Sequence, residues 1–493
     1  MVLVVLLLFA MGGAQAFEAE RFRSVVERGM ADWQVPGMAV AVIEDGEVVF
    51  QEGFGRTVLD AGAPVDTHTL FANASTTKAM VVSGILMLVD EGRLSLDAPV
   101  IDVLPELHFQ DPALAPQLTL RDLLAHRTGL PSTDVWTFYQ GMPLDEQIRR
   151  LRAVPSAAAP RTRLIYQNTM YELAGLMIER ASGKPWEAFL EERLWGPVGM
   201  DETVGMRGRI PRGKAHAMPY GIFDGAPRRM DFSLRPELAD AAGSVWSSIH
   251  DMTRWAQFLL RGGVTEDGRR LVSEASWAQV FEPQQIATPE DFYPTVALTK
   301  PQWRTYSLGW YQQDFGGRRI DFHTGSLNGL VAIIGLERAA NRAVIVMANR
   351  DHAELRHALL WEVMDLTPAS SKRDWHTEVL RLYAARERAA AEEWARLEAA
   401  RLEGVAPTLP VASYAGDYAS PAWGEVRLAV DGDALALATG ARRYRLTPWQ
   451  GDTFLLMHKD WVRGEFVTFE VTPAGRVAAI HLFESRFAAG GAD

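Results

Sequence analysis

The stretch "FANASTTKAM", residues 71–80, leads directly into "VVSGILMLVDEGRLS", an almost wholly apolar segment that predicts a buried helix. This helix would begin at Ser75 and carry Lys78 in its first turn. A cation near a helix N-terminus opposes the helix macrodipole at a cost of about 0.3–1 kcal/mol, and a buried lysine must also lose its water. Lys78 is therefore expected to have a partner, and Ser75 is placed to be that partner because residues i and i+3 share a helix face.

Ser75 and Lys78 together have the chemistry of an activated nucleophile. The start of a helix stabilises negative charge that develops on the Ser75 oxygen. A desolvated lysine has a lowered pKa, so Lys78 can accept a proton. The alternative is structural, with Ser75 as an N-cap and Lys78 as a snorkelling side chain. The S-x-x-K pattern alone favours this structural alternative, and other segments must decide between the two.

The composition bounds the class of protein. The chain has 493 residues, 48% of them hydrophobic, which predicts two or three domains. The net charge is −12 and no basic run is present, which argues against a nucleic-acid partner. The absence of cysteine from the sequence excludes disulfides and thiol nucleophiles.

The N-terminus has the pattern of a signal peptide. Residues 2–11 form an apolar run that is too short to span a bilayer, and Ala14-Gln15-Ala16 supplies a small-x-small cleavage site. No Lys or Arg precedes the run. We expect a signal peptide over residues 1–16, a mature protein that is periplasmic or secreted, and no integral membrane segment after its removal.

The distribution of strands and helices predicts an α+β fold. The stretch "VPGMAVAVIEDGEVVFQEGFG" (35–55) has two β-rich runs around Asp45-Gly46, a hairpin signal. Residues 118–262 have mostly helical periodicity, and strands return after about residue 303. We therefore expect an antiparallel sheet built from both ends of this region, flanked by helices and with a helical subdomain inserted.

The C-terminal part of the chain has a different pattern. Residues 372–404 are rich in Ala, Arg and Glu and predict a solvated connecting helix. The rest alternates in short β runs, which predicts a small barrel or sandwich. The expected division is a signal peptide (1–16), a catalytic domain (17–371), a connecting helix (372–404) and an all-β C-terminal domain (405–493).

The segment "RLIYQNTMYELAG" carries two more candidate site residues. Tyr166 could transfer a proton, and Asn168 could donate a hydrogen bond to a substrate carbonyl. Asn168 could equally cap a helix that starts near Thr169.

The segment "DFHTGSLNG" carries candidates on a predicted strand. Gly325 would let a substrate lie against the strand edge. The backbone N–H groups of Ser75 and Ser326 could form an oxyanion hole. His323 precedes this glycine by two residues. The other histidines have structural interpretations: His126 is expected to bond a neighbouring loop.

S-T-T-K (75–78), Y-Q-N (166–168) and H-T-G (323–325), in this order, resemble the three motifs of the serine β-lactamase and penicillin-binding-protein family. The likeness covers roughly residues 20–365 and includes "LTLRDLLAHRTGLP" (118–131) and "AAGSVWSSIHDMTRWAQFLL" (241–260). Y-x-N is similar to the motif of class C β-lactamases, D-alanyl-D-alanine peptidases, D-aminopeptidases and related esterases.

The resemblance implies a role for each motif residue. Ser75 would be the acylated nucleophile, and Lys78 and Tyr166 would share the general-base and general-acid work. Asn168 would orient the substrate carbonyl. His323 stands where β-lactamases have a lysine; because histidine is largely neutral at pH 7, it is a poorer anchor for a substrate carboxylate.

The resemblance therefore implies an exported serine hydrolase that forms an acyl-enzyme and cleaves amide or ester bonds. The expected substrates are peptides that contain D-amino acids, or related esters. The alternatives are a class C-like β-lactamase and a non-catalytic module that binds cell-wall peptides.

No cofactor or metal is implied, and "DHAELRH" (351–357) does not match the zinc motif H-E-x-x-H. The sequence also has no G-x-S-x-G elbow, which argues against an α/β-hydrolase. The C-terminal region resembles the lipocalin-like domain of some relatives, and in an archaeal one this domain builds the oligomer. This resemblance implies a homo-oligomer through the C-terminal domain.

Overall fold

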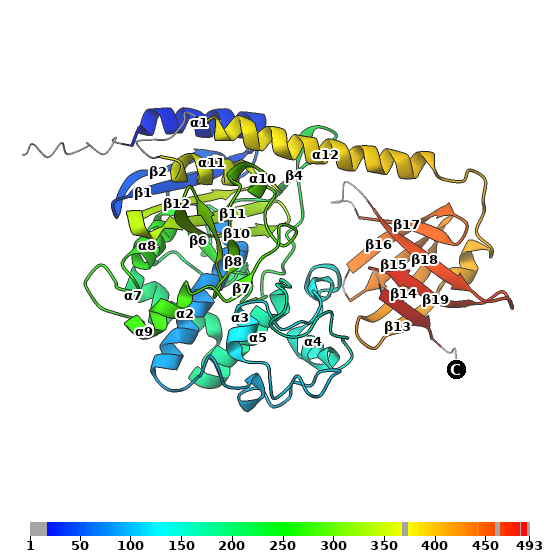
Figure 1. Ribbon diagram of the computed structural model, residues 1–493. Helices are drawn as coiled ribbons and strands as arrows, with labels where there is room; N and C mark the ends of the chain where they lie inside the picture. Colours follow the sequence, from blue (N-terminus) through cyan, green and yellow to red (C-terminus); the bar gives the residue numbers. More distant parts are fainter. Residues whose placement is uncertain (1–16, 367–372, 441, 459–463, 484, 491–493) are drawn as a thin grey trace, which may run out of the picture.

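The computed structural model describes residues 17–366, 373–440, 442–458, 464–483 and 485–490. The signal peptide expected over residues 1–16 lies outside the described residues. The chain forms a large α+β unit and a closed β-barrel, joined by one long helix (Figure 1). The predicted fold class, an antiparallel sheet with flanking helices and a C-terminal barrel, is confirmed.

An eight-stranded antiparallel sheet forms the centre of the larger unit. Its strand order is β2-β1-β12-β11-β10-β9-β8-β7. The strands are β1 (Gly37–Glu44), β2 (Glu47–Gly55), β7 (Gln285–Ile286), β8 (Arg304–Tyr306), β9 (Tyr311–Phe315), β10 (Arg318–Leu327), β11 (Leu330–Glu337) and β12 (Arg342–Ala348). Two short antiparallel strand pairs lie outside it: β3 (Leu70–Ala72) with β6 (Trp246–Ser248), and the hairpin of β4 (Tyr220–Phe223) with β5 (Ala226–Arg229).

The two ends of this unit meet in the middle of the sheet. β1 pairs with β12, with Met38 opposite Ala348, and with β2 on its other side. Asp45 and Gly46 both have positive φ angles, 52° and 85°, as a two-residue type I′ turn requires. The hairpin predicted at this dipeptide and the sheet built from both ends are confirmed.

Helices cover both faces of the sheet (Figure 1). One face carries α1 (Ala19–Asp32), α11 (Leu355–Met364) and the start of α12 (Trp375–Ala399). Against the other pack α8 (Ile249–Leu260), on β1, β2 and β12, and the helical region around α2 (Thr77–Asp90). The other α-helices are α3 (Leu120–Leu124), α4 (Leu144–Leu151), α5 (Asn168–Ser182), α6 (Trp186–Leu190), α7 (Gly196–Val198), α9 (Glu274–Val280) and α10 (Val296–Thr299). The short helical turns are η1 (Ala74–Thr76), η2 (Val100–Asp102), η3 (Val135–Gln140), η4 (Glu191–Trp195), η5 (Arg207–Arg209), η6 (Arg338–Ala340) and η7 (Val411–Tyr414).

The helix α12 is solvated over only part of its length. Trp375 and Val379, in its first two turns, are buried in the same hydrophobic cluster as α11. From Arg386 onward most of its residues are exposed. The prediction of a solvated connecting helix is therefore wrong for its first turns, because a short apolar stripe there docks on the larger unit. None of the helices in the described ranges is long and apolar enough to cross a membrane.

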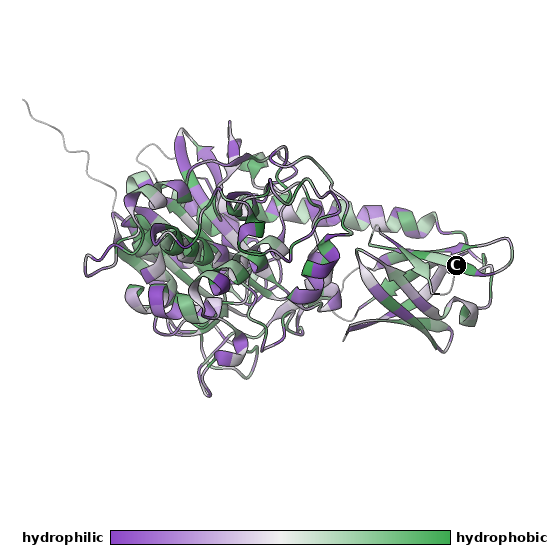
Figure 2. Ribbon diagram, turned by 90° about the horizontal axis from the view of Figure 1, so that it is seen from below, coloured by the Kyte–Doolittle hydropathy of each residue, from purple (hydrophilic) through white to green (hydrophobic). Residues whose placement is uncertain are grey.

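The C-terminal barrel has eight antiparallel strands in sequence order. Buried and exposed residues alternate along them, as in β14, which gives each strand one apolar face (Figure 2). The strands are β13 (Gly416–Ser420), β14 (Gly424–Asp431), β15 (Ala434–Thr439), β16 (Arg442–Gln450), β17 (Thr453–Met457), β18 (Glu465–Val471), β19 (Val477–Leu482) and β20 (Ser485–Ala489).

The barrel docks on the segment that includes η3 of the larger unit. The Tyr444 hydroxyl donates to the Tyr139 carbonyl (2.8 Å), and Gln140 Nε2 donates to the Trp423 carbonyl (2.7 Å). The Trp423 ring lies 5.8 Å from that of Trp136, which is fully buried. The two units therefore share a packed contact in addition to the connecting helix.

Candidate active site

Ser75 lies in η1, the single helical turn between β3 and α2. The predicted start of the long helix is thus shifted, because α2 begins at Thr77. Ala74, immediately before Ser75, is buried and has a φ of 46°, a conformation that a non-glycine residue adopts at a cost in energy. Ser75 is the only residue between positions 69 and 88 that is partly exposed. This segment therefore presents one hydroxyl to the surface of the site.

Lys78 is fully buried, and its ammonium nitrogen is held by three oxygen atoms. Nζ lies 2.9 Å from Ser75 Oγ, 2.8 Å from Asn168 Oδ1 and 2.8 Å from the Ala242 carbonyl oxygen. Asn168 is the first residue of α5, and its side chain does not cap that helix. The structure therefore joins the first two motifs and a loop residue, Ala242, around one nitrogen.

The pKa of Lys78 is lowered to about 7 because burial penalises the charged amine. The carboxylates of Asp240, Asp134 and Glu172 oppose this shift. Burial also raises the pKa of the Glu172 carboxyl well above its usual value. A large fraction of Lys78 is consequently unprotonated at neutral pH.

Tyr166 packs against the same pair. Its ring centroid lies 5.0 Å from Lys78 Nζ, and its hydroxyl is hydrogen-bonded with Ser75. Burial raises the pKa of this phenol well above 10, and the neighbouring Tyr311 adds to the shift. Tyr166 is therefore a neutral phenol at physiological pH, able to give a proton but a poor base.

His323 lies behind the site and does not line its cavity. It is 1% exposed; its Nδ1–H donates to the Thr324 carbonyl (2.7 Å), and its Nε2 accepts from the Tyr306 hydroxyl (3.1 Å). Burial lowers the pKa of His323 to about 3, and Lys78 adds to the shift. This neutral imidazole is buried in an aromatic layer, so the geometry gives it no contact with a substrate carboxylate.

His126 belongs to the same buried layer. Its Nδ1 accepts a hydrogen bond from the Gln167 backbone N–H (3.2 Å), and its ring centroid lies 4.1 Å from that of Tyr166. The prediction that His126 bonds a neighbouring loop is confirmed. The contact supports Tyr166 from behind.

Gly325 brings β10 against the turn that carries Ser75. A Cβ atom at Gly325 would lie 2.8 Å from the Ser75 backbone nitrogen and would overlap the Asn73 carbonyl oxygen. The glycine was expected to make room for a substrate; instead, it makes room for η1. The same approach sets Ser326 beside Ser75, the two residues whose backbone N–H groups were predicted to form an oxyanion hole.

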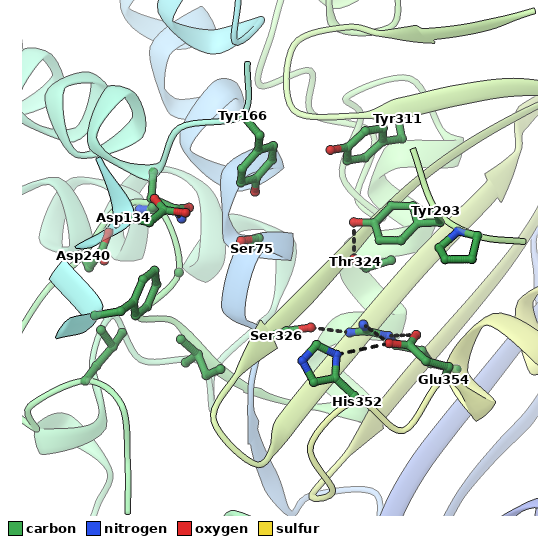
Figure 3. Close-up of a pocket in the computed structure, with 18 of the residues that line it drawn as sticks. Ser75, Asp134, Tyr166, Asp240, Tyr293, Tyr311, Thr324, Ser326, His352 and Glu354 are labelled. Atoms are coloured by element: carbon green, nitrogen blue, oxygen red, sulfur yellow. Dashed lines mark hydrogen bonds and ion pairs between the residues drawn. The ribbon is translucent and has the colours of Figure 1, made fainter. Parts of the chain in front are cut away.

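A cavity of about 470 Å³ opens in front of Ser75 (Figure 3). Ser75, Tyr166, Asn168 and Ser326 all line it. The other lining residues are Asp134, Phe138, Leu234, Asp240, Ala242, Gly243, Tyr293, Pro294, Tyr311, Thr324, Leu327, His352, Glu354, Arg356, Tyr383 and Arg386. The cavity is therefore large enough for a small peptide or ester, and Ser75, the predicted nucleophile, is one of its lining residues.

Several residues that line the cavity were not predicted from the sequence. Asp134 and Asp240 form one wall, and Tyr293 and Glu354 lie on the other side of Ser75 (Figure 3). Asp240 immediately precedes the family-like stretch 241–260, and this position is the one sequence signal that could have identified it as a site residue. Asp134 is the residue immediately before η3, in a segment without a recognisable motif.

The wall opposite the two aspartates holds a compensated ion pair. Arg356 Nη2 lies 3.2 Å from Glu354 Oε1, and Nη1 donates to Ser326 Oγ (2.9 Å). Both side chains are almost fully buried. Arg356 therefore anchors β10 and contributes little free charge to the cavity. Among the described residues, no group of three or more His, Asp or Glu side chains is arranged to hold a metal ion.

Comparison with known proteins agrees with this geometry. The model of the family described as Beta-lactamase matches residues 22–369, and that described as "Domain of unknown function (DUF3471)" matches residues 400–492. The chain is 28% identical to the Unguisins hydrolase ungD of Aspergillus violaceofuscus (strain CBS 115571), over 92% of this chain and 83% of the relative. It is 29% identical to Esterase EstB of Burkholderia gladioli, over 46% of this chain and 60% of the relative.

The fold is shared with a solved structure along nearly the whole chain. The octameric penicillin-binding protein homologue from Pyrococcus abyssi superposes with a TM-score of 0.63 at 22% sequence identity, covering 96% of this chain and 100% of that chain. Both the sheet-containing unit and the barrel are thus part of a known architecture.

Proposed function

Because this chain belongs to the Beta-lactamase family, whose members include serine hydrolases, we propose that it is a serine hydrolase that forms an acyl-enzyme on Ser75. The observation that carries the proposal is the set of three contacts around Lys78 Nζ. Two of its partners, the Asn168 amide oxygen and the Ala242 carbonyl, can only accept hydrogen bonds. A neutral amine has two N–H groups for these acceptors, and its lone pair then faces the Ser75 hydroxyl.

Lys78 is therefore the base that takes the Ser75 proton in our proposal. Its pKa of about 7 makes it a good match for this task at neutral pH. Tyr166 is unsuited to be that base because the pKa of its phenol is raised. Its proton is instead available to the leaving group.

The proposed reaction has two halves. Ser75 Oγ attacks the carbonyl carbon as its proton passes to Lys78, and the backbone N–H groups of Ser75 and Ser326 stabilise the oxyanion. The bond to the leaving group then breaks, and the leaving nitrogen or oxygen takes a proton from Tyr166, which Lys78 re-protonates. A water molecule repeats the sequence on the acyl-enzyme, and the product carries a free carboxyl group.

The substrate class follows from the motif resemblance and the relatives. Amides or esters are proposed, with peptides that contain D-residues, or related esters, as the first choice. The relatives are a hydrolase and an esterase by name. A β-lactamase is the weaker candidate, because buried, neutral His323 offers no cation to a β-lactam carboxylate. A binding module is weaker still, since it would need neither the Lys78 nor the Tyr166 proton.

Covalent labelling tests the nucleophile directly. A fluorophosphonate probe is expected to add one equivalent to the wild-type protein, mapped by mass spectrometry to Ser75. Ser75→Ala should remain unlabelled, whereas Ser24→Ala, at an exposed position in α1, should react like the wild type. Equal labelling of wild type and Ser75→Ala would show that the assignment is wrong.

Two further properties belong to this proposal. We expect export through the signal peptide at residues 1–16, tested by finding Phe17 as the first residue of the protein recovered outside the cytoplasm. We also expect copies to assemble through the barrel, since the structural relative is described as octameric. Light scattering of the purified protein tests that expectation.

A further inference from the structure

Two carboxyl groups, those of Asp134 and Asp240, line the cavity together with Ser75, and no cation of the described residues forms an ion pair with either of them. Asp240 is 2% exposed, and its Oδ1 accepts from the Ala242 backbone N–H (2.7 Å). Within the described ranges, its Oδ2 has no hydrogen-bond partner, although the residue lines the cavity. Because Asp240 Oδ2 is not one of the buried unpartnered atoms, it is accessible from the cavity and can accept a hydrogen bond from a group bound there.

Asp134 lies next to Asp240 on the same wall (Figure 3). Its Oδ1 accepts from Asn168 Nδ2 (3.0 Å). Neither aspartate forms an ion pair within 4.0 Å among the described residues, so Lys78 acts on them only at longer range. The backbone of Asn168 and the side chain of Ser132 also form hydrogen bonds with Asp134. The two carboxyl groups therefore lie at one end of the cavity without a cation in direct contact among the described residues.

The position of this charge relative to the reacting atoms is fixed by a chain of hydrogen bonds. Ser75 contacts Lys78, Lys78 contacts Asn168, and Asn168 contacts Asp134. The Asn168 amide nitrogen has a second N–H free for a substrate carbonyl. A group bound by the aspartates would consequently sit beside the acyl carbon that Ser75 attacks.

Aromatic side chains complete the surroundings of this position. Phe138 and Tyr166 line the cavity together with the two aspartates. Aromatic faces attract cations. The opposite wall offers no competing acid of this kind, because Glu354 is already paired with Arg356.

We propose that Asp134 and Asp240 bind the ammonium group of the substrate, so that the enzyme acts on acyl groups carrying a free amine next to the scissile carbonyl. This inference rests on the proposed function and deepens it: the protein would remove an N-terminal aminoacyl residue, or hydrolyse an aminoacyl ester, rather than cleave within a blocked chain. Burial raises the pKa of Asp240 to about 6, so this carboxyl group is mostly ionised near pH 7.

Matched substrates test the proposal. Alanine p-nitroanilide, as both the D and L enantiomers, is compared with propionyl p-nitroanilide, which lacks only the amine. For the wild type we expect kcat/KM for the better alanine enantiomer to exceed that of the propionyl compound at least tenfold. In Asp240→Asn and Asp134→Asn this ratio should fall at least tenfold, and in Asp433→Asn, at an exposed barrel position, it should not change.

The ratio of kcat/KM for the alanine compound to that for the propionyl compound distinguishes ammonium binding by the aspartates from an effect of the aspartates on Lys78. If the aspartates serve only to adjust the base, both substrates slow equally and the ratio is unchanged, which would overturn the proposal. A wild-type ratio near one would do the same.

A second measurement needs neither turnover nor a folded variant. Alaninamide should protect wild-type Ser75 from fluorophosphonate labelling at a concentration at least tenfold below that of propionamide. Equal protection would contradict ammonium binding while leaving the nucleophile assignment intact. Absence of labelling at Ser75 would instead overturn the proposed function, and this inference with it.

Discussion

The lowered pKa of Lys78 predicts how acylation depends on pH. A base with a pKa of about 7 is half neutral at pH 7, and at pH 5 only about 1% of it is neutral, since each pH unit changes the ratio tenfold. The rate constant for labelling of Ser75 should therefore rise about 100-fold from pH 5 to a plateau above pH 8. Lys78→Met should lose this dependence and be slower by about 10²–10⁴-fold at the plateau.

The same pKa predicts a change in stability. In the unfolded chain Lys78 has a pKa near 10.4, so between pH 7 and 10 the unfolded state binds a proton that the folded state does not. The free energy of unfolding of the wild type should therefore rise with pH, relative to Lys78→Met, by about 1.4 kcal/mol per pH unit. Between pH 7 and pH 9 the difference amounts to about 2.3 kcal/mol, because the folded state still binds half a proton at pH 7. Asp240, with a pKa of about 6, titrates below this window.

Two assays check these values independently. The labelling rate with an uncharged fluorophosphonate is measured from pH 5 to pH 9.5, and urea unfolding of both proteins is followed by tryptophan fluorescence at pH 7, 8 and 9. A labelling rate that climbs tenfold per unit up to pH 9.5 would place the pKa near that of a solvated lysine. A stability difference independent of pH would refute the reasoning from burial.

The remaining predictions concern the neighbours of this pair. Tyr166→Phe should lower kcat/KM for an anilide by about 10²–10⁴-fold but act much less on a p-nitrophenyl ester, whose leaving group departs without a proton; equal losses would exclude Tyr166 as the acid. Gly325→Ala should abolish labelling of Ser75 and lower the free energy of unfolding by about 1–3 kcal/mol, because the added methyl overlaps the Asn73 carbonyl; activity retained at the wild-type level would contradict the close approach. Trp423→Ala, which removes the barrel ring from Trp136, should lower the melting temperature, as measured by calorimetry, and should lower kcat/KM for an ester several-fold. Unchanged kinetics would show that the barrel does not support the part of the cavity wall that η3 contributes.

Much of the fold could be predicted because it is specified locally. The turn at Asp45-Gly46 fixes the register of the first hairpin, and the end of α5 at Gly183 follows from a glycine with φ of 76°. The alternating pattern after residue 410 likewise encodes the barrel. These features depend on neighbours within a few residues, which a single sequence displays directly.

The candidate site could be predicted only in part, because its remaining components come from distant segments. Asp134 and Asp240 share a wall although 106 positions separate them in the chain, and no local pattern indicates this. The side on which a strand residue lies also depends on the final packing: His323 faces the buried aromatic layer, and Thr324, the next residue, lines the cavity.

The pairing of β1 with β12 has a consequence for how the protein is made. Met38 and Ala348 are partners across the sheet, yet 310 positions separate them in the chain. At a synthesis rate of about 5–20 residues per second, the first hairpin must wait roughly 15–60 s for its neighbour to leave the ribosome. During that time the β1 edge that later pairs with β12 stays open, a surface on which chaperones or a second nascent chain can act. The barrel has a shorter interval, because its closing pair, Tyr418 in β13 and Ala489 in β20, is 71 positions apart and needs roughly 4–14 s of synthesis.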